Sequence, residues 1–198
     1  MKPHILRYAV KPAVFVLCLL PLLWLVIGIV YDLLGANPVE TLTRDTGEWA
    51  LRFLLVTLTV TPLRQLSGWG WLLRLRRMLG LFAFFYALLH FATYLWLDQF
   101  FDWAEIGRDI IKRPFITVGF TAFVLLLPLA LTSTHAMMKR LGKKWKQLHQ
   151  LVYIIPVLGV LHYLWIVKAD TREPAVYFAI FLLLMAYRAY TQRRRATP

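Results

Sequence analysis

The feature that most constrains this chain is a series of long apolar runs separated by short charged segments. Each run approaches the length of about 20 mostly apolar residues that a bilayer-spanning helix needs. The runs cover residues 13–31, 49–66, 79–97, 115–132, 149–167 and 175–190. With 60% of its residues apolar, the chain is too hydrophobic for a water-soluble globule. We therefore predict an all-α integral membrane protein with six transmembrane helices, in which residues 1–198 form a single transmembrane domain.

The charged residues predict how these helices are oriented. The N-terminal tail, the second-to-third and fourth-to-fifth connections and the C-terminal end carry Lys and Arg without any acidic residue. All 10 acidic residues lie in the other three connections. Short loops rich in Lys and Arg stay on the cytoplasmic side of a membrane. We therefore expect both termini to be cytoplasmic and the acidic loops to face outward. The net charge of +13 then reflects topology and lipid contact, and no nucleic-acid partner is expected.

The single cysteine, Cys18, excludes several redox chemistries. One thiol cannot form an intramolecular disulfide, a Cys-x-x-Cys relay, a c-type haem attachment or the four-thiolate ligation typical of iron–sulfur clusters. The chain also has no Gly-x-Gly-x-x-Gly or Walker lysine motif, so no nucleotide-binding fold is indicated. A redox cofactor in this chain would have to be held without covalent bonds, by histidine or by packing.

Two histidines lie at similar depth within the predicted membrane. His90 and His162 are on helices that both run from the cytoplasmic to the outer side. At a rise of about 1.5 Å per residue, their depths differ by only about 3 Å. An ionisable residue inside a membrane is a functional candidate, and two neutral imidazoles on facing helices are able to bind a haem iron from both sides. The alternative is a hydrogen bond between the two helices.

His149 precedes His162 on the same predicted helix by about 20 Å, which suits a second haem near the opposite face of the membrane. The positions that would face it on the third helix hold Arg76 and Arg77. Three interpretations follow: a second haem with a single or unusual ligand, a haem propionate paired with these arginines, and a histidine at headgroup level without a ligand role. Pro156, between the two histidines, is expected to kink the helix.

The other histidines and the basic connector are less specific. His4 and His135 lie in cytoplasmic segments and are expected to be solvated. The connector between the fourth and fifth helices contains Gly142, which fits a turn between short helical pieces. Its Lys and Arg residues are able to hold a haem propionate or a flavin phosphate. No internal repeat is apparent, and no loop is long enough to fold as a separate domain.

Three segments carry a specific resemblance to a known family. They are Thr61–Leu63 with Leu75–Leu81 and Leu89–His90, then Leu131–Tyr153 with its Leu-Gly-Lys-Lys-Trp and Leu-His-Gln-Leu-Val-Tyr motifs, and finally Leu161–Trp165, which reads Leu-His-Tyr-Leu-Trp. Together with the Gly35–Val39 loop, they resemble the haem-binding membrane subunits of bacterial protein-methionine-sulfoxide reductase systems over nearly the whole chain. That family lies within the ferric reductase-like transmembrane superfamily.

The resemblance implies a ferric reductase-like bundle that holds haem b between its third and fifth helices, with His90, His149 and His162 at the haem-ligand positions. It implies one haem, or two if His149 also binds one, together with flavin mononucleotide (FMN). It implies a heterodimer with a periplasmic molybdopterin-containing methionine sulfoxide reductase at the bacterial inner membrane. Electrons would come from the quinone pool or from a separate flavin reductase. Two-haem relatives have a fourth histidine on the third helix, where this chain has Arg76.

Other functions are compatible with the same residues. A stand-alone membrane cytochrome that reduces iron, oxygen or quinone would turn over without a partner. A cofactor-free membrane anchor would purify as a colourless protein. A transporter is less well supported, because the repeats and discontinuous helices typical of that class are not visible in the sequence. The expected function is an electron conduit, with sulfoxide reduction occurring on the partner subunit.

Overall fold

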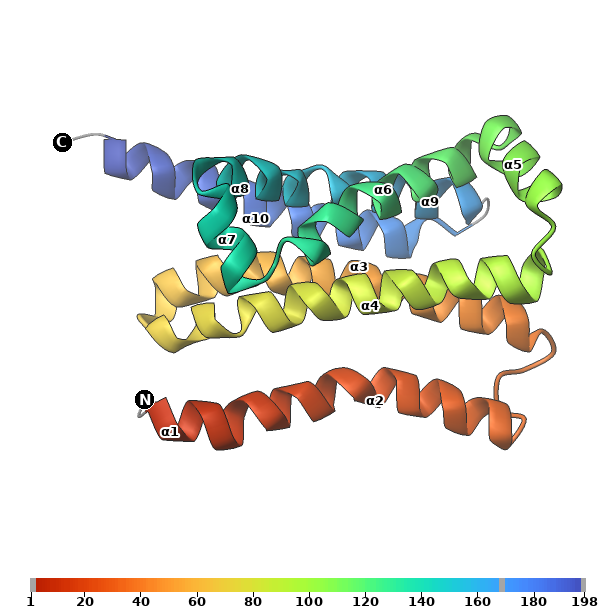
Figure 1. Ribbon diagram of the computed structural model, residues 1–198, viewed down its shortest axis with the longest axis horizontal. Helices are drawn as coiled ribbons and strands as arrows, with labels where there is room; N and C mark the ends of the chain where they lie inside the picture. The colour runs from red at the N-terminus through yellow and green to blue at the C-terminus, as the bar shows by residue number, and fades with distance from the viewer. Residues whose placement is uncertain (1–2, 168–169, 197–198) are drawn as a thin grey trace.

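The long helices of the computed structural model run side by side along one axis (Figure 1). The structure describes residues 3–167 and 170–196, and no strand occurs within these two ranges. The prediction of an all-α chain is therefore confirmed for them. In chain order, the elements are α1 (Pro3–Ile5), the π-helix η1 (Leu6–Val10), α2 (Lys11–Val30), α3 (Pro38–Ser67), the 3-10 helix η2 (Gly70–Arg74), α4 (Arg76–Thr93), the π-helix η3 (Tyr94–Asp98), α5 (Trp103–Lys112), α6 (Pro114–Leu131), α7 (His135–Leu141), α8 (Lys143–Leu148), the 3-10 helix η4 (His149–Tyr153), α9 (Ile155–Ile166) and α10 (Arg172–Ala196).

Local sequence signals explain where several helices begin and end. Asn37 caps α3 by accepting the backbone N–H of Glu40 at 3.3 Å, and Pro38 follows in the first turn, where its missing N–H costs nothing. α3 ends at Gly68, whose φ of +73° lies in the left-handed region that favours glycine. Asp102 caps α5 by accepting two backbone N–H groups of its first turn.

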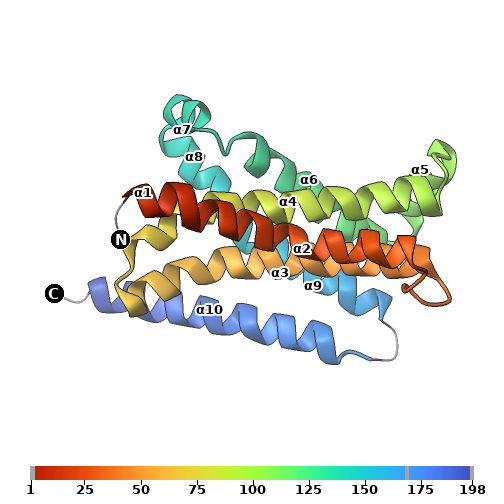
Figure 2. The same ribbon diagram turned by 90° about the horizontal axis from the view of Figure 1, so that it is seen from below.

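The helices form three layers. In Figure 1, the α3–α4 pair lies between α2 on one side and α6, α9 and α10 on the other, and Figure 2 shows α2 crossing this pair. The most extensive contacts join α3 to α4 and α6 to α9. α3 is the central helix and has the longest series of buried residues, among them Leu58 with 0% exposure.

Five helical stretches are long and apolar enough to cross a membrane: residues 3–30, 76–98, 114–131, 143–166 and 172–194. α3, with 30 residues, is long enough, but Arg52, Arg64 and Gln65 lower its mean hydropathy. Because its neighbours cover it, α3 needs less apolar surface than the outer helices. Leu17 on α2 and Leu183 on α10 are exposed by 60% and 71%, as lipid-facing side chains are.

Tyr86 attaches α2 to the rest of the bundle. Its hydroxyl accepts the backbone N–H of Leu22 at 3.1 Å and donates to the carbonyl oxygen of Cys18 at 2.9 Å. These two backbone groups are four residues apart and bond to each other in a regular helix. The buried phenol hydroxyl therefore bonds to both backbone groups of one step in the hydrogen-bond ladder of α2.

The two ends of the bundle differ in composition. The start of α1 and the end of α10 lie with α7 and α8 at one end, which we call the inner end (Figure 1). α5 and the connection from α2 to α3 lie at the opposite, outer end. The inner end carries the basic connectors and the outer end the acidic ones. The structure differs from the prediction of one helix over residues 149–167. This segment consists of η4 followed by α9, and Pro156 lies in the first turn of α9.

Candidate functional site

His90 on α4 and His162 on α9 meet where the α3–α4 pair faces the α6–α9 pair, nearer the outer end. Their ring centroids are 6.0 Å apart and their planes are inclined by 78°. Both side chains are half-buried. The distance agrees with the equal depth predicted for the two imidazoles. Two imidazoles that bound one metal ion from opposite sides, with metal–nitrogen bonds of about 2 Å, would have a similar centroid separation of about 6 Å.

Hydrogen bonds assign the proton on each of these rings. Nδ1 of His90 lies 2.7 Å from the carbonyl oxygen of Thr43 on α3, and Nδ1 of His162 lies 2.7 Å from the carbonyl oxygen of Phe115 on α6. A carbonyl oxygen only accepts, so each Nδ1 carries the proton and donates it. Each Nε2 then has a free lone pair. A backbone carbonyl on the second ring nitrogen is the arrangement that fixes metal-ligating histidines.

A glycine one helical turn after each carbonyl makes room for the ring. A Cβ atom on Gly47 would lie 2.9 Å from Nδ1 of His90, and one on Gly119 would lie 2.6 Å from Nδ1 of His162. Each hydrogen-bonded pair is also separated by the same 47 residues. The two halves of the bundle thus build matching cradles, although no repeat is visible in the sequence.

The paired imidazoles have the donor chemistry of a bis-histidine haem site. Two axial nitrogens leave four positions of six-coordinate iron for a porphyrin. The surroundings are apolar and aromatic: Phe91, one residue after His90, stacks with Phe123 of α6 at 4.8 Å. Burial of this kind, with hydrogen-bonded ligands, is what tunes a haem potential.

His149 lies at the inner end, where α8 passes into η4. Its Nδ1 donates to the carbonyl oxygen of Trp145 at 3.1 Å, and its ring stacks on the Trp145 indole at 3.9 Å. Its Nε2 is buried without a hydrogen-bond partner. Arg76 is half-buried at the start of α4, whereas Arg77 is exposed. His149 thus presents one free ligand nitrogen and, among the described residues, no facing histidine.

Sequence reasoning missed the role of Arg188. It counts this residue among the basic residues of the cytoplasmic end, but the structure turns the guanidinium into the bundle. Nη2 donates to the carbonyl oxygen of Leu58 at 2.7 Å, and Nη1 donates to the hydroxyl of Tyr153 at 2.9 Å. Pro62 in the α3 segment was the sequence signal for this contact. A proline has no N–H, so the carbonyl oxygen four residues earlier, that of Leu58, lacks its helical donor and needs another.

A second network near the outer end was also missed. The Tyr163 hydroxyl lies 2.8 Å from Glu48 Oε1 and 2.5 Å from Glu173 Oε2, and Arg52 pairs with Glu48 at 2.6 Å. Arg52 also donates to Tyr177 at 2.8 Å. Glu48 follows the glycine that supports His90, and Tyr163 follows His162. The network is therefore at the same level of the bundle as the histidine pair.

A buried carboxylate holds the outer end together. Asp109 of α5 is 3% exposed and pairs with Arg113 at 3.0 Å. It also accepts from Tyr94 at 3.3 Å and from Gln99 at 3.4 Å. These bonds fix α5 to the end of the helix that carries His90.

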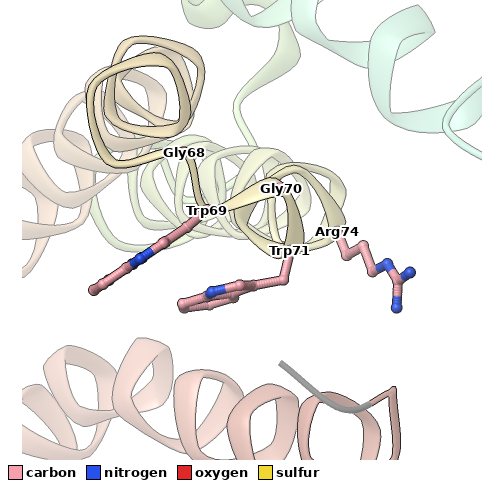
Figure 3. A pocket seen from close by; sticks show the side chains of 5 residues that line it. All are labelled: Gly68, Trp69, Gly70, Trp71 and Arg74. Atoms are coloured by element: carbon pink, nitrogen blue, oxygen red, sulfur yellow. The ribbon is translucent and has the colours of Figure 1, made fainter.

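A cavity of about 460 Å³ lies apart from the predicted site residues, at the turn between α3 and α4. It is lined by Gly68, Trp69, Gly70, Trp71 and Arg74. Figure 3 shows the two indoles on the same side of the turn. They stack at 5.8 Å, and their place at the inner end suits the aromatic belt of a membrane interface. The remaining histidines, His4 and His135, are exposed, as expected.

The chain is similar to known proteins over most of its length. Residues 46–160 match the model of the family described as ferric reductase like transmembrane component. A protein of Herminiimonas arsenicoxydans is 56% identical over 184 residues, which cover 91% of this chain and 84% of that protein. A protein of Azospira oryzae is 56% identical over 192 residues, which cover 96% and 82%. Both relatives bear the name protein-methionine-sulfoxide reductase heme-binding subunit MsrQ. No solved structure matches the chain.

Proposed function

Because this chain belongs to the MsrQ family of heme-binding subunits of protein-methionine-sulfoxide reductase, within the ferric reductase-like transmembrane proteins, we propose that it conducts electrons outward across the bacterial inner membrane. Its inner end faces the cytoplasm, all six long helices including α3 span the bilayer, and residues 1–198 form one multi-pass domain. The segregation of basic connectors to the inner end supports this orientation.

The observation that carries the proposal is the matched pair of free Nε2 atoms. His90 and His162 would hold the iron of haem b through these nitrogens, and the carbonyl groups of Thr43 and Phe115 orient the two rings. When bound, haem b supplies a one-electron Fe(III)/Fe(II) couple. The chain's own residues hold both imidazoles neutral, exclude water and keep the site at a fixed depth. These are the properties of an electron carrier rather than of a substrate-converting site.

Sulfoxide reduction takes place on a second subunit in this proposal. One methionine sulfoxide takes up two electrons and two protons and yields one thioether and one water. The partner is a periplasmic molybdopterin-containing reductase, and it forms a heterodimer with this chain at the outer end. The electrons come from the quinone pool or from a separate flavin reductase, and FMN serves as a further carrier.

His149 is the ligand of a second haem near the inner end. Its buried, unpartnered Nε2 supports this assignment, as does the fixed Nδ1 proton. No second histidine faces it among the described residues, so its ligation differs from that of the His90–His162 pair. Arg76 contributes positive charge beside this site.

The test is a reduced-minus-oxidised absorbance spectrum of detergent-purified protein, with haem counted per chain after haem supply during expression is verified. His90→Ala and His162→Ala are each expected to abolish the main b-type signal, whereas the exposed His135→Ala control keeps it. Full haem content in both single variants would refute the ligand assignment. A colourless wild-type protein would leave only a membrane anchor. Reductase turnover without the periplasmic partner would indicate a stand-alone cytochrome instead.

A further inference from the structure

Two arginines at the inner end have no ion pair with an acidic side chain among the residues that the structure describes. All 10 acidic side chains lie in the connections of the outer end or in the parts of the helices that adjoin them. Arg188 is nonetheless half-buried there and points inward to the Leu58 carbonyl oxygen. Arg76 is the first residue of α4, lies at the same end of the bundle and is also half-buried. Like charges brought together away from water need a counter-anion, and no described residue of the inner end has an acidic side chain to provide it.

Two hydrogen bonds fix the guanidinium of Arg188, and its other N–H groups remain available to bind a ligand. Pro62 has no N–H, so the Leu58 carbonyl oxygen lacks its helical partner, and Arg188 Nη2 replaces it. The Tyr153 hydroxyl accepts from Nη1, and the Tyr153 ring centroid lies 5.4 Å from the guanidinium carbon. Nε is buried without a partner. Guanidinium has five N–H donors, and these two bonds use only two of them.

Further buried polar atoms without partners belong to the same end of the bundle. They are Thr61 Oγ1 and Gln65 Oε1 of α3 and Nε2 of His149. Thr61 and Gln65 are one turn apart and lie on the helix face that also presents Leu58, to which Arg188 is bonded. Buried polar groups are almost always satisfied by protein, water or ligand. Unpartnered polar atoms at the same end of the bundle as an uncompensated charge therefore indicate a site that a ligand completes.

We propose that Arg188, with Arg76, binds the oxyanion of a ligand that occupies the His149 site. The preferred oxyanion is a carboxylate of the porphyrin whose iron binds His149 Nε2, since one ligand then satisfies both the imidazole and the arginines. The phosphate of a flavin or a phospholipid has the same recognition chemistry and is the other source to distinguish. This inference rests on the proposed function, because it places a second cofactor at His149.

The test separates anion binding from a purely structural role of Arg188. Pro62→Ala restores an N–H that bonds the Leu58 carbonyl oxygen, so it removes the need for Arg188 as a cap while keeping its charge. Arg188→Gln is then made in the Pro62→Ala background. Arg188→Lys, made in the same background, provides the conservative comparison. Tyr153→Phe is the matched control, because it removes the other hydrogen bond of the guanidinium and leaves the charge. Haem, flavin and phospholipid phosphorus are counted per chain in each sample, and a redox titration resolves the haem components.

We expect Pro62→Ala with Arg188→Gln to lose the same haem component as His149→Ala, while the His90–His162 component keeps its amplitude. Arg188→Lys should retain part of the lost component, and Tyr153→Phe nearly all of it. A selective loss of flavin or phospholipid phosphorus would assign the oxyanion to a phosphate. Unchanged haem, flavin and phosphorus, with unchanged potentials, would overturn the proposal and leave Arg188 as a helix cap. If His149→Ala alone changes no cofactor, the second-haem assignment fails, and the phosphorus count still tests the oxyanion site.

Discussion

The imidazole of His162 lies directly on the backbone of α6, with its Nδ1 2.7 Å from the carbonyl oxygen of Phe115. This contact is possible only because the residue one turn later is Gly119. The ligand is therefore oriented by main-chain atoms, which leave no side-chain signature in the sequence. The same relationship joins His90 to α3.

Alanine at Gly119 is expected to displace the ring. The added Cβ would lie 2.6 Å from His162 Nδ1, and overpacking of this kind costs about 1–3 kcal/mol. Haem per chain and the thermal unfolding temperature of Gly119→Ala should both fall. Gly47→Ala should show the same effect at His90, where the Cβ would lie 2.9 Å from Nδ1. Gly70→Ala is the control, because nothing lies within 4 Å of its Cβ. Wild-type haem content in Gly119→Ala would contradict the cradle.

Glu48 is expected to influence the potential of the histidine-bound haem. A carboxylate near a haem stabilises Fe(III) relative to Fe(II). Glu48→Gln removes this charge and should therefore raise the midpoint potential of the bound haem by an amount on the order of tens of mV. Redox titration of the His90–His162 component measures this shift. Glu105→Gln alters an exposed carboxylate that pairs with Arg108 and should leave the potential in place. An unchanged or lowered potential in Glu48→Gln would argue against electrostatic coupling.

Tyr86→Phe is expected to weaken the attachment of α2. The variant loses the bonds to Leu22 and Cys18 and should be destabilised by about 1 kcal/mol. The loss is limited because the two backbone groups are then free to bond to each other. Tyr86→Ala removes a fully buried ring and should cost about 3–5 kcal/mol. Thermal unfolding in detergent ranks the two variants, and equal losses would show that ring packing is unimportant.

Asp109→Ala is expected to loosen the outer end. It removes a buried acceptor shared by Arg113, Tyr94 and Gln99, which should cost about 1–3 kcal/mol. Limited proteolysis should then cut near α5 sooner than in the wild-type protein. Glu105→Ala breaks only the exposed pair with Arg108 and should change stability by less than about 1 kcal/mol. Equal proteolysis of the two variants would refute a structural role for Asp109.

The features that could be predicted from the sequence are those that depend on the type and spacing of side chains along one segment. Apolar runs and the placement of Lys and Arg predict the long helices, and helix rise predicts that His90 and His162 reach the same depth. The ring distance of 6.0 Å agrees with that expectation. Pro156 indicated the change at the start of α9, but not that His149 would begin a 3-10 helix.

The rest depends on contacts between distant parts of the chain. Arg188 reaches a backbone carbonyl 130 residues earlier, and a basic residue near a helix end otherwise suggests only membrane topology. The Tyr163 bond to Glu48 joins residues 115 apart. Neither pairing follows from periodicity or spacing, because each depends on how the layers pack.

The two levels at which imidazoles occur along the bundle have an electrical consequence. His149 and His162 are separated by about 20 Å along the helix direction, which is roughly two thirds of a hydrocarbon core of about 30 Å. With the inner end in the cytoplasm, an electron moving from the first level to the second travels toward the positive side of the membrane. In the proposed orientation, with a haem at each level, transfer would be electrogenic, and a membrane potential of about 100 mV would favour it by an amount on the order of 1.5 kcal/mol per electron. In this proposal, the membrane potential as well as the reductant would supply free energy for the reduction of methionine sulfoxide on the outer side of the membrane.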